Sequence, residues 1–164
     1  MPLQETAQRA GLLSLVVIFC IAGDQITKEI AIRYLADSPA LSYGFDTLRF
    51  QYAENPGAFL SLGANLSVTT RFWVFTVFST VLLLGMSIYV FISKQMNRFM
   101  LVSFALMIGG GFSNLIDRIG NQGRVVDFIN LGIGNLRTGI FNVADMVVLL
   151  GALFLIWGSR RIRD

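Results

Sequence analysis

Two aspartates in the second half of the chain lie where paired carboxyl groups could carry out acid–base chemistry. Asp127 sits inside an apolar run, Val125–Ile129, and Asp145 follows Asn142 at the start of an apolar block. When two carboxyl groups lie close together, the repulsion between two negative charges raises the free energy of ionising both, so one of them keeps its proton. Such a pair supplies a general base and a general acid at once, and it needs no histidine, thiol or metal.

Each aspartate has a simpler explanation when it is considered alone. Asn142 is a good N-cap residue, which would place Asp145 in the first turn of a helix, close to a capping box. Asp127 could be an ordinary loop aspartate. The sequence leaves open whether the two side chains approach each other. If they do, the apolar neighbours of Asp127 predict that it holds the shared proton.

The residue types that are missing narrow the possible chemistry. The chain contains no histidine and a single cysteine, Cys20, which lies inside an apolar run. These facts exclude Ser-His-Asp and Cys-His catalysis, histidine-based zinc sites and an intramolecular disulfide. A hydrolase of this composition must use carboxylates or lysine, and we expect no cofactor and no metal.

A second set of polar residues follows the first long apolar block of the chain, at about residues 7–23. Asp24, Thr27 and Lys28 are spaced i, i+3 and i+4, so they share one face of a helix just past that block. An ion-paired helix end at the membrane interface explains this spacing, and so does a functional site.

A third set lies at the end of a glycine run. Gly109–Gly111 permit the close approach of another helix or of a bound peptide. Asn114, Asp117 and Arg118 then share one helical face at i, i+3 and i+4. Helix packing with an interfacial ion pair explains most of this pattern, but it does not explain the amide of Asn114 at membrane depth.

The composition predicts an α-helical integral membrane protein with a single domain over residues 1–164. The chain is 54% hydrophobic and only 14% charged, with a mean hydropathy of +0.65. Four apolar blocks predict four transmembrane helices, at about 7–23, 72–93, 99–116 and 143–157. Two outer loops, at about 24–71 and 117–142, would connect them.

The charge distribution predicts the orientation in the membrane. Lys and Arg residues flank the apolar blocks and are in excess on the side that holds both termini, so that side should be cytoplasmic. The polar sets described above would then face outward. No basic face is formed, which argues against nucleic-acid binding despite the net charge of +3.

The first outer loop is expected to contain short structured elements. Phe45–Tyr52 alternates loosely and favours short strands, Glu54–Gly57 is typical of a turn, and Leu66–Arg71 could lie at the membrane interface.

Five motifs in this order resemble those of the bacterial lipoprotein signal peptidases (signal peptidase II). The resemblance covers essentially the whole chain, and the five motifs together are far more specific than any one of them. They are Asp24-x-x-Thr27-Lys28, Asn55-x-Gly57-Ala58, the glycine run ending in Asn114-x-x-Asp117-Arg118, Val125-Val126-Asp127-Phe128, and Phe141-Asn142-x-Ala144-Asp145.

The resemblance implies an aspartic endopeptidase of the bacterial plasma membrane that cleaves diacylglyceryl-modified prolipoproteins at the outer face. The expected fold adds a small β cradle and a short interfacial helix to the four spans, and we expect a monomer surrounded by membrane lipids. Asp127 and Asp145 match the catalytic aspartates of the family. The positions that match the pocket or its support are Asp24, Lys28, Asn55, Gly57, Gly110, Asn114, Arg118, Asn142 and Ala144.

The sequence departs from the family pattern at three places. Ser113 stands where glycine is commoner, the segment from Arg118 to Asp127 is one residue longer than usual, and Leu136–Ile140 replaces an aromatic and proline-containing stretch. These departures put loop behaviour and substrate preference in doubt, but not the aspartate pair.

Three other functions stay open on the sequence alone. An ion-coupled transporter would need acids along a path across the membrane, and here they cluster at one depth. A non-catalytic assembly subunit would use the glycine run for helix packing only. A metal-dependent hydrolase is possible because carboxylates and amides suit hard cations.

Overall fold

The first helix is longer than the sequence predicts. The structure is a computed structural model that describes residues 3–94 and 96–160, and its helix α1 runs over Leu3–Leu35. A helix of this length extends about 50 Å, which exceeds the roughly 30 Å hydrocarbon thickness of a bilayer. Residues 24–35, predicted to begin a loop, continue this helix. Asp24 and Lys28 can be buried in it because Ser113 and Asp117 on α4 supply their partners.

The second helix begins earlier than expected. Three labelled segments form one continuous apolar helix over Val68–Ile92, and these are α2 (Val68–Arg71), the π-helical η2 (Phe72–Phe78) and α3 (Ser79–Ile92). Ser67 caps its start by accepting a hydrogen bond from the backbone N–H of Thr70 at 3.1 Å. The stretch predicted to be interfacial thus leads directly into the second span. A separate short 3-10 turn, η1 (Phe59–Ser61), lies before it.

Two further helices complete the bundle. Helix α4 covers Arg98–Gly120 and α5 covers Val143–Arg160, so the second outer loop starts later than predicted, after residue 120. Three of the described helices are long and apolar enough to cross a membrane, and α5 has a shorter apolar stretch over Val143–Gly158. The predicted helical membrane fold is confirmed, and the crossing of the membrane by α5 stays a prediction.

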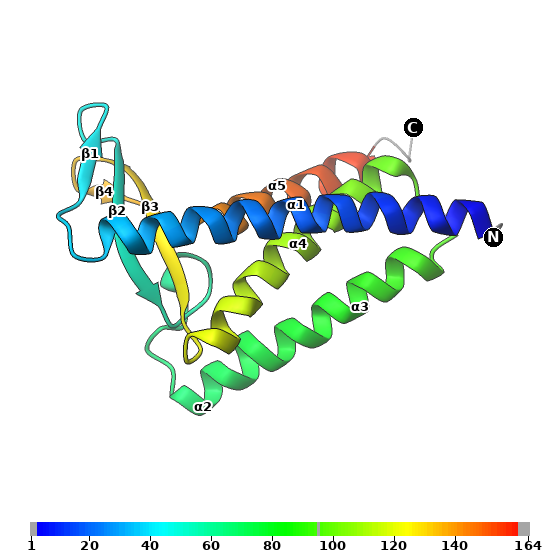
Figure 1. The fold of residues 1–164 in the computed structure, drawn as a ribbon, viewed down its shortest axis with the longest axis horizontal. Helices are drawn as coiled ribbons and strands as arrows, with labels where there is room; N and C mark the ends of the chain where they lie inside the picture. Colours follow the sequence, from blue (N-terminus) through cyan, green and yellow to red (C-terminus); the bar gives the residue numbers. More distant parts are fainter. Residues whose placement is uncertain (1–2, 95, 161–164) are drawn as a thin grey trace.

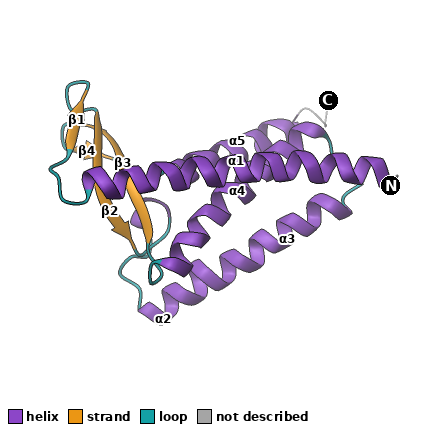
Figure 2. Cartoon of the chain, in the orientation of Figure 1, coloured by secondary structure: helices purple, strands orange, loops and turns teal. Residues whose placement is uncertain are grey.

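The two segments predicted as outer loops pair with each other in one antiparallel sheet. The sheet was expected in the first of these segments, and the pairing with the second was not predicted. Its strands are β1 (Leu41–Tyr43), β2 (Leu48–Asn55), β3 (Val125–Ile133) and β4 (Leu136–Arg137), in that order across the sheet. The sheet sits at one end of the helices, and α1 starts and α5 ends at the other end (Figures 1 and 2). In the register of β2 and β3, Ala53 lies opposite Asp127 and Asn55 opposite Val125.

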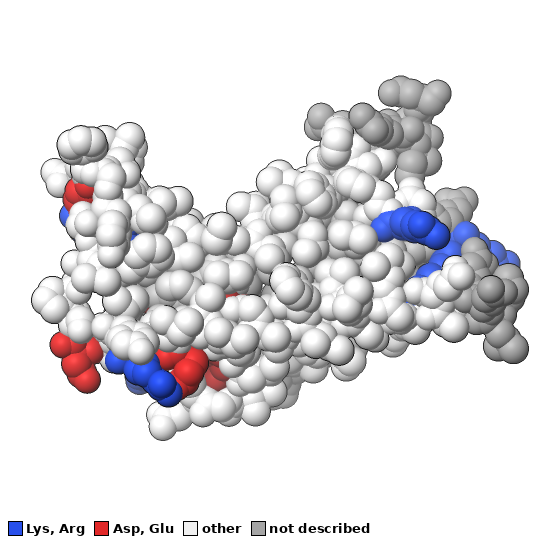
Figure 3. Space-filling model, turned by 45° about the horizontal axis from the view of Figure 1, so that its top comes forward, with Lys and Arg blue, Asp and Glu red and all other residues white. Residues whose placement is uncertain are grey.

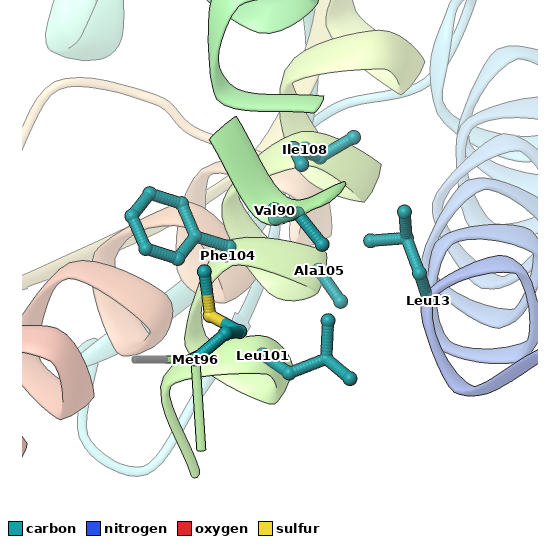
Figure 4. Packing of buried hydrophobic residues seen from close by; sticks show 7 residues of the cluster. All are labelled: Leu13, Val90, Met96, Leu101, Phe104, Ala105 and Ile108. Carbon is teal, nitrogen blue, oxygen red and sulfur yellow. The ribbon is translucent and has the colours of Figure 1, made fainter. Parts of the chain in front are cut away.

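The apolar core lies in the half of the bundle away from the sheet. Helix α4 packs against α1, α3 and α5, so it is the central helix. Figure 4 shows side chains of α1, α3 and α4 meeting around Val90 and Ala105, both of which have no exposed surface. A smaller cluster of Ala31, Leu35 and Phe128 joins the C-terminal end of α1 to the sheet.

The charged side chains gather at the two ends of the molecule. The face drawn in Figure 3 has Lys and Arg at the end opposite the sheet, acidic and basic residues together at the sheet end, and a long uncharged stretch between them. Many large apolar side chains on the helices are exposed, such as Phe19 at 78% and Val81 at 62%. This surface is the one that a bilayer would solvate.

Small residues allow the helices to approach closely where the polar residues meet. A Cβ added at Gly110 would lie 2.5 Å from the carbonyl oxygen of Ala144 on α5, and one at Gly109 would lie 2.8 Å from Cβ of Cys20 on α1. The glycine run therefore holds α4 against both neighbours, which is how small residues act in membrane proteins.

We predict that Gly110→Ala weakens the fold, whereas Gly85→Ala on α3 does not. The added methyl group at residue 110 has no room beside the α5 backbone, while nothing lies within 4 Å of a Cβ at residue 85. Thermal unfolding of the purified protein should give a midpoint lower by several degrees for Gly110→Ala only, since each kilocalorie per mole of lost stability lowers the midpoint by roughly 2–4 °C in a domain of this size. Equal midpoints for the two variants would contradict this packing.

Candidate active site

One asparagine contacts both predicted catalytic aspartates. Asn142 Nδ2 donates to Asp127 Oδ1 at 2.6 Å, and the Asn142 backbone N–H donates to Asp145 Oδ2 at 3.3 Å. Asn142 Oδ1 accepts the backbone N–H of Asp145 at 2.9 Å, which completes the predicted helix cap at the start of α5. The side chains of β3 and α5 thus meet around a single residue.

The chain returns to β3 just before α5, and this places Asn142. Phe141 forms a bridge with Ile129, with hydrogen bonds of 2.8 and 2.9 Å between their backbones. Asn142 follows immediately and is fully buried, so its amide points into the site and not into solvent. Its Nδ2 also lies 3.2 Å from the carbonyl oxygen of Val126.

Asn55 holds Asp127 from the other strand. Its Nδ2 donates to Asp127 Oδ2 at 2.8 Å and to the carbonyl oxygen of Ala58 at 2.9 Å, and its Oδ1 accepts the N–H of Gly57 at 2.8 Å. The end of β2 is thereby folded into a turn beside the carboxyl group. A Cβ at Gly57 would lie 2.5 Å from the carbonyl oxygen of Leu62, so this turn has no space for a larger residue.

Asn114 and Arg118 approach the site from α4. Asn114 Nδ2 donates to Asp145 Oδ1 at 2.9 Å. Arg118 donates to the carbonyl oxygen of Gly57 at 2.9 Å and to that of Asn114 at 3.3 Å, and its guanidinium lies 6.0 Å from the centre of the Phe75 ring. Arg118 therefore ties the turn after β2 to α4.

A buried ion cluster lies beside the aspartate pair. Lys28 contacts Asp24 Oδ2 at 2.6 Å and Asp117 Oδ2 at 2.8 Å, and its third partner is Asn114 Oδ1 at 2.9 Å. The side chains of the two acids and the lysine are at most 7% exposed. Asp24 also accepts the backbone N–H of Ala144 at 2.7 Å, so the cluster reaches the start of α5.

All the predicted site residues lie in this region, in several different roles. The Asn and Asp side chains, Lys28 and Arg118 form a connected hydrogen-bond network, Ala144 joins it through its backbone, and Gly110 contributes only close helix packing. Three members lie outside the predicted set of site residues. Gln25 donates to Asp117 Oδ1 at 2.7 Å, and Ser113 Oγ donates to Asp24 Oδ2 at 2.7 Å. Asp117 itself is the third, which the sequence places only on the helical face of Asn114 and Arg118. In the sequence Ser113 stands out only as a departure from glycine, although a hydroxyl next to Asn114 in an apolar helix indicates a polar contact.

Burial and a like charge act together on Asp127. Burial and, to a smaller extent, the nearby Asp145 carboxylate raise the pKa of the Asp127 carboxyl group to about 7, despite the opposing effect of the Asn55 and Asn142 amides and of Lys28. A carboxyl group in this state keeps its proton in mildly acidic solution. The site therefore offers a proton donor at Asp127 next to a second carboxyl group, which is the combination required for hydrolysis by an aspartate pair.

The donors around the carboxyl groups are amide, hydroxyl and ammonium groups. Within residues 3–94 and 96–160, no group of three or more His, Cys, Asp or Glu side chains is placed to hold a metal ion.

Comparisons with known proteins point to one family. Residues 16–161 match the family model described as signal peptidase (SPase) II. The chain is 35% identical over 153 residues to a lipoprotein signal peptidase of Chlorobium phaeobacteroides (strain DSM 266), with 88% of this chain and 85% of the relative covered. It is 36% identical over 152 residues to a lipoprotein signal peptidase of Francisella tularensis subsp. mediasiatica, with 88% and 89% covered.

Solved structures agree with the sequence comparison. A chain described as a bacterial membrane enzyme, solved by the in meso method at 2.3 Å resolution, superposes with a TM-score of 0.77 at 28% identity, over 94% of this chain and 90% of the other. A second such enzyme, solved at 1.9 Å resolution, gives a TM-score of 0.74 at 27% identity, over 91% and 92%.

We predict that Asp127 titrates near neutral pH. Its raised pKa means that the carboxyl group stays protonated below about pH 7 and ionises above it. Infrared difference spectra recorded from pH 5 to 9 should show the C=O stretch of a protonated carboxyl group that disappears around pH 7. This band should be absent from Asp127→Asn and present in Asp37→Asn, which removes an exposed acid. Titration of the band near pH 4 would contradict the buried environment.

Proposed function

This chain belongs to the signal peptidase II family, and on that basis we propose that Asp127 and Asp145 are its catalytic pair. The chain is a bacterial membrane protease of the aspartic class, and it removes signal peptides from prolipoproteins. This identity sets aside the ion-coupled transporter and the non-catalytic assembly subunit. The proposal therefore concerns the chemical roles of the individual residues in this hydrolysis.

The observation that carries the proposal is the shared contact through Asn142. One residue binds Asp127 through its side chain and Asp145 through its backbone, so the two carboxyl groups are held on either side of it. Every other donor to these two groups comes from a buried or half-buried amide. A pair placed in this way can share one proton and divide the two catalytic tasks.

The proposed reaction is direct hydrolysis by water. Asp145, ionised, takes a proton from a water molecule, and the oxygen of that water forms a bond to the scissile carbonyl carbon. Asp127 donates its proton to the oxygen that becomes negative. When the carbon–nitrogen bond breaks, Asp145 gives its proton to the leaving amine, and one hydroxyl of the tetrahedral intermediate returns a proton to Asp127 as the carbonyl re-forms. Asp145 is then ionised and Asp127 protonated, as at the start. The raised pKa of Asp127 supports its role as the proton donor.

Arg118 and the turn after β2 are placed to bind the substrate backbone. The Nε of Arg118 is buried and has no hydrogen-bond partner among the described residues, so it can donate to a peptide carbonyl. Asn55 and Gly57 hold the turn in a fixed shape beside Asp127. Asn114 keeps Asp145 oriented from α4.

The substrate and the location follow from the same proposal. The site lies at the sheet end of the helices, opposite the end where α1 starts and α5 ends (Figure 1). With the cationic end in the cytoplasm, both termini are inside and the site is at the outer boundary of the plasma membrane. There a prolipoprotein that carries diacylglycerol can present its cleavage site while its acyl chains stay in the bilayer, and a monomer suffices.

We predict that Asp127→Asn and Asp145→Asn each lower kcat on a diacylglyceryl-modified prolipoprotein peptide by at least about 10³-fold, because each removes one of the two proton-transfer groups. Purified protein in lipid, with EDTA present throughout, provides the assay. Both variants should unfold near the wild-type temperature, since Asn preserves the size of each side chain, and Asp37→Asn should cleave at the wild-type rate.

Two results would overturn parts of this proposal. Turnover near the wild-type rate by either variant would remove that aspartate from the chemistry. Loss of wild-type activity in EDTA, restored by a divalent cation, would favour the metal-dependent hydrolase over the aspartate pair.

A further inference from the structure

The ion cluster beside the active site has a geometry that salt bridging alone does not require. Lys28 lies between Asp24 on α1 and Asp117 on α4, and all three side chains are almost completely buried. Replacing a buried ion pair by apolar residues is often neutral or stabilising, so burial of three charges does not by itself explain their presence. Their other hydrogen bonds point to a further role.

Each acid of the cluster binds the backbone N–H that immediately precedes one of the proposed catalytic aspartates. Asp24 Oδ1 accepts from Ala144 N at 2.7 Å, one residue before Asp145. Asp117 Oδ2 accepts from Val126 N at 3.1 Å, one residue before Asp127. The two backbone segments that carry the aspartates are thus attached to two carboxylates that a single ammonium group holds together.

We propose that Asp24, Lys28 and Asp117 form a positioning clamp that sets how far apart, and at what angle, the two catalytic carboxyl groups lie. The clamp rests on the proposed function, because it acts through Asp127 and Asp145. None of its three members touches the reacting atoms. The effect of the two acids passes through the backbone at residues 126 and 144.

The third hydrogen bond of Lys28 adds a side-chain connection to the same clamp. Lys28 Nζ donates to Asn114 Oδ1 at 2.9 Å, and Asn114 Nδ2 donates to Asp145 Oδ1 at 2.9 Å. An ammonium group can only donate, so it forces the amide oxygen of Asn114 toward itself and the amide N–H₂ toward Asp145. Lys28 therefore fixes the orientation of a donor as well as the position of two backbone segments.

Two further residues, Ser113 and Gln25, add a second connection between α1 and α4 in the clamp. Ser113 Oγ donates to Asp24 and accepts from Gln25 Nε2 at 3.1 Å, and Gln25 Nε2 also donates to Asp117. The two acids are consequently bridged twice, once by Lys28 and once by the Gln25–Ser113 pair. Such double bridging limits the freedom of α1 and α4 to move relative to each other at the level of the active site.

Positioning of this kind has a measurable kinetic signature. A displacement of about 1 Å in a catalytic group can lower the rate on the order of 100-fold even when the substrate still binds. Loss of the clamp should therefore reduce kcat and leave KM nearly unchanged, whereas loss of a substrate contact would raise KM.

The test compares Asp117→Ala, Asp117→Asn and Asp24→Ala with wild type in lipid, on the diacylglyceryl-modified peptide. Asp145→Asn serves as the reference for the pair itself. Asp46→Asn is the matched control. Asp46 also accepts hydrogen bonds from two basic side chains, but it lies in the turn between β1 and β2, and its side-chain partners Ser42, Arg49 and Arg137 are not part of the site. Residue-level hydrogen exchange of the Val126 and Ala144 amides is measured on the same samples.

The clamp predicts a specific pattern across these variants. Asp117→Ala should lose about 100-fold in kcat, with KM within about threefold of wild type. Asp117→Asn retains an oxygen that can accept the Val126 N–H, so it should recover much of that loss. The Val126 amide should exchange faster in Asp117→Ala and the Ala144 amide faster in Asp24→Ala, while mid-helix amides of α5 keep their protection.

Failure of the clamp and failure of the catalytic pair give different results. If Asp145→Asn is inactive but Asp117→Ala and Asp24→Ala keep the wild-type kcat, the clamp is wrong and the pair stands. If Asp145→Asn itself turns over normally, the pair is wrong. A loss of kcat in Asp117→Ala without faster exchange at Val126 would also overturn the clamp, and this readout applies even if the variant is less stable.

Discussion

A carboxyl group buried at the edge of a bilayer loses the water that would solvate it, and protein donors have to replace that water. Asp24, Asp117, Asp127 and Asp145 all meet this requirement with donors from outside their own helix or strand. The hydrogen bonds that replace water around these carboxyl groups are therefore the same bonds that join the helices to one another and to the sheet. These four carboxyl groups and their hydrogen-bond donors form a polar layer at the sheet end of the helices, and the rest of the architecture is arranged around it.

The layer accounts for the division of the molecule into two halves. At the end away from the sheet the helices meet through apolar side chains such as Val90 and Ile108, which need shape complementarity but no directed bonds. At the sheet end they meet through hydrogen bonds, and Gly109 and Gly110 let α4 come close enough to its neighbours for those bonds to form. The sheet then covers the polar layer and supplies Asp127 itself.

Much of this arrangement could be predicted from local sequence, and the parts that could not depend on long-range contacts. Hydropathy located the helices, and Asn142 before Asp145 predicted the cap that the structure contains. Hydropathy also ended the first helix at residue 23, because it treats Asp24 and Lys28 as exposed although each satisfies the other. The register that brings Asn55 to Asp127 depends on pairing between two distant loops, which no local pattern encodes.

The pH dependence of kcat/KM tests most directly whether one protonated and one ionised carboxyl group carry out the hydrolysis. Such a profile reports the ionisations of the free enzyme. It should be bell-shaped, and it should fall above about pH 7, because Asp127 then loses the proton that it has to donate. A rate that stays level or continues to rise from pH 7 to 9 would contradict the assignment of Asp127 as the proton donor and, with it, the shared-proton mechanism.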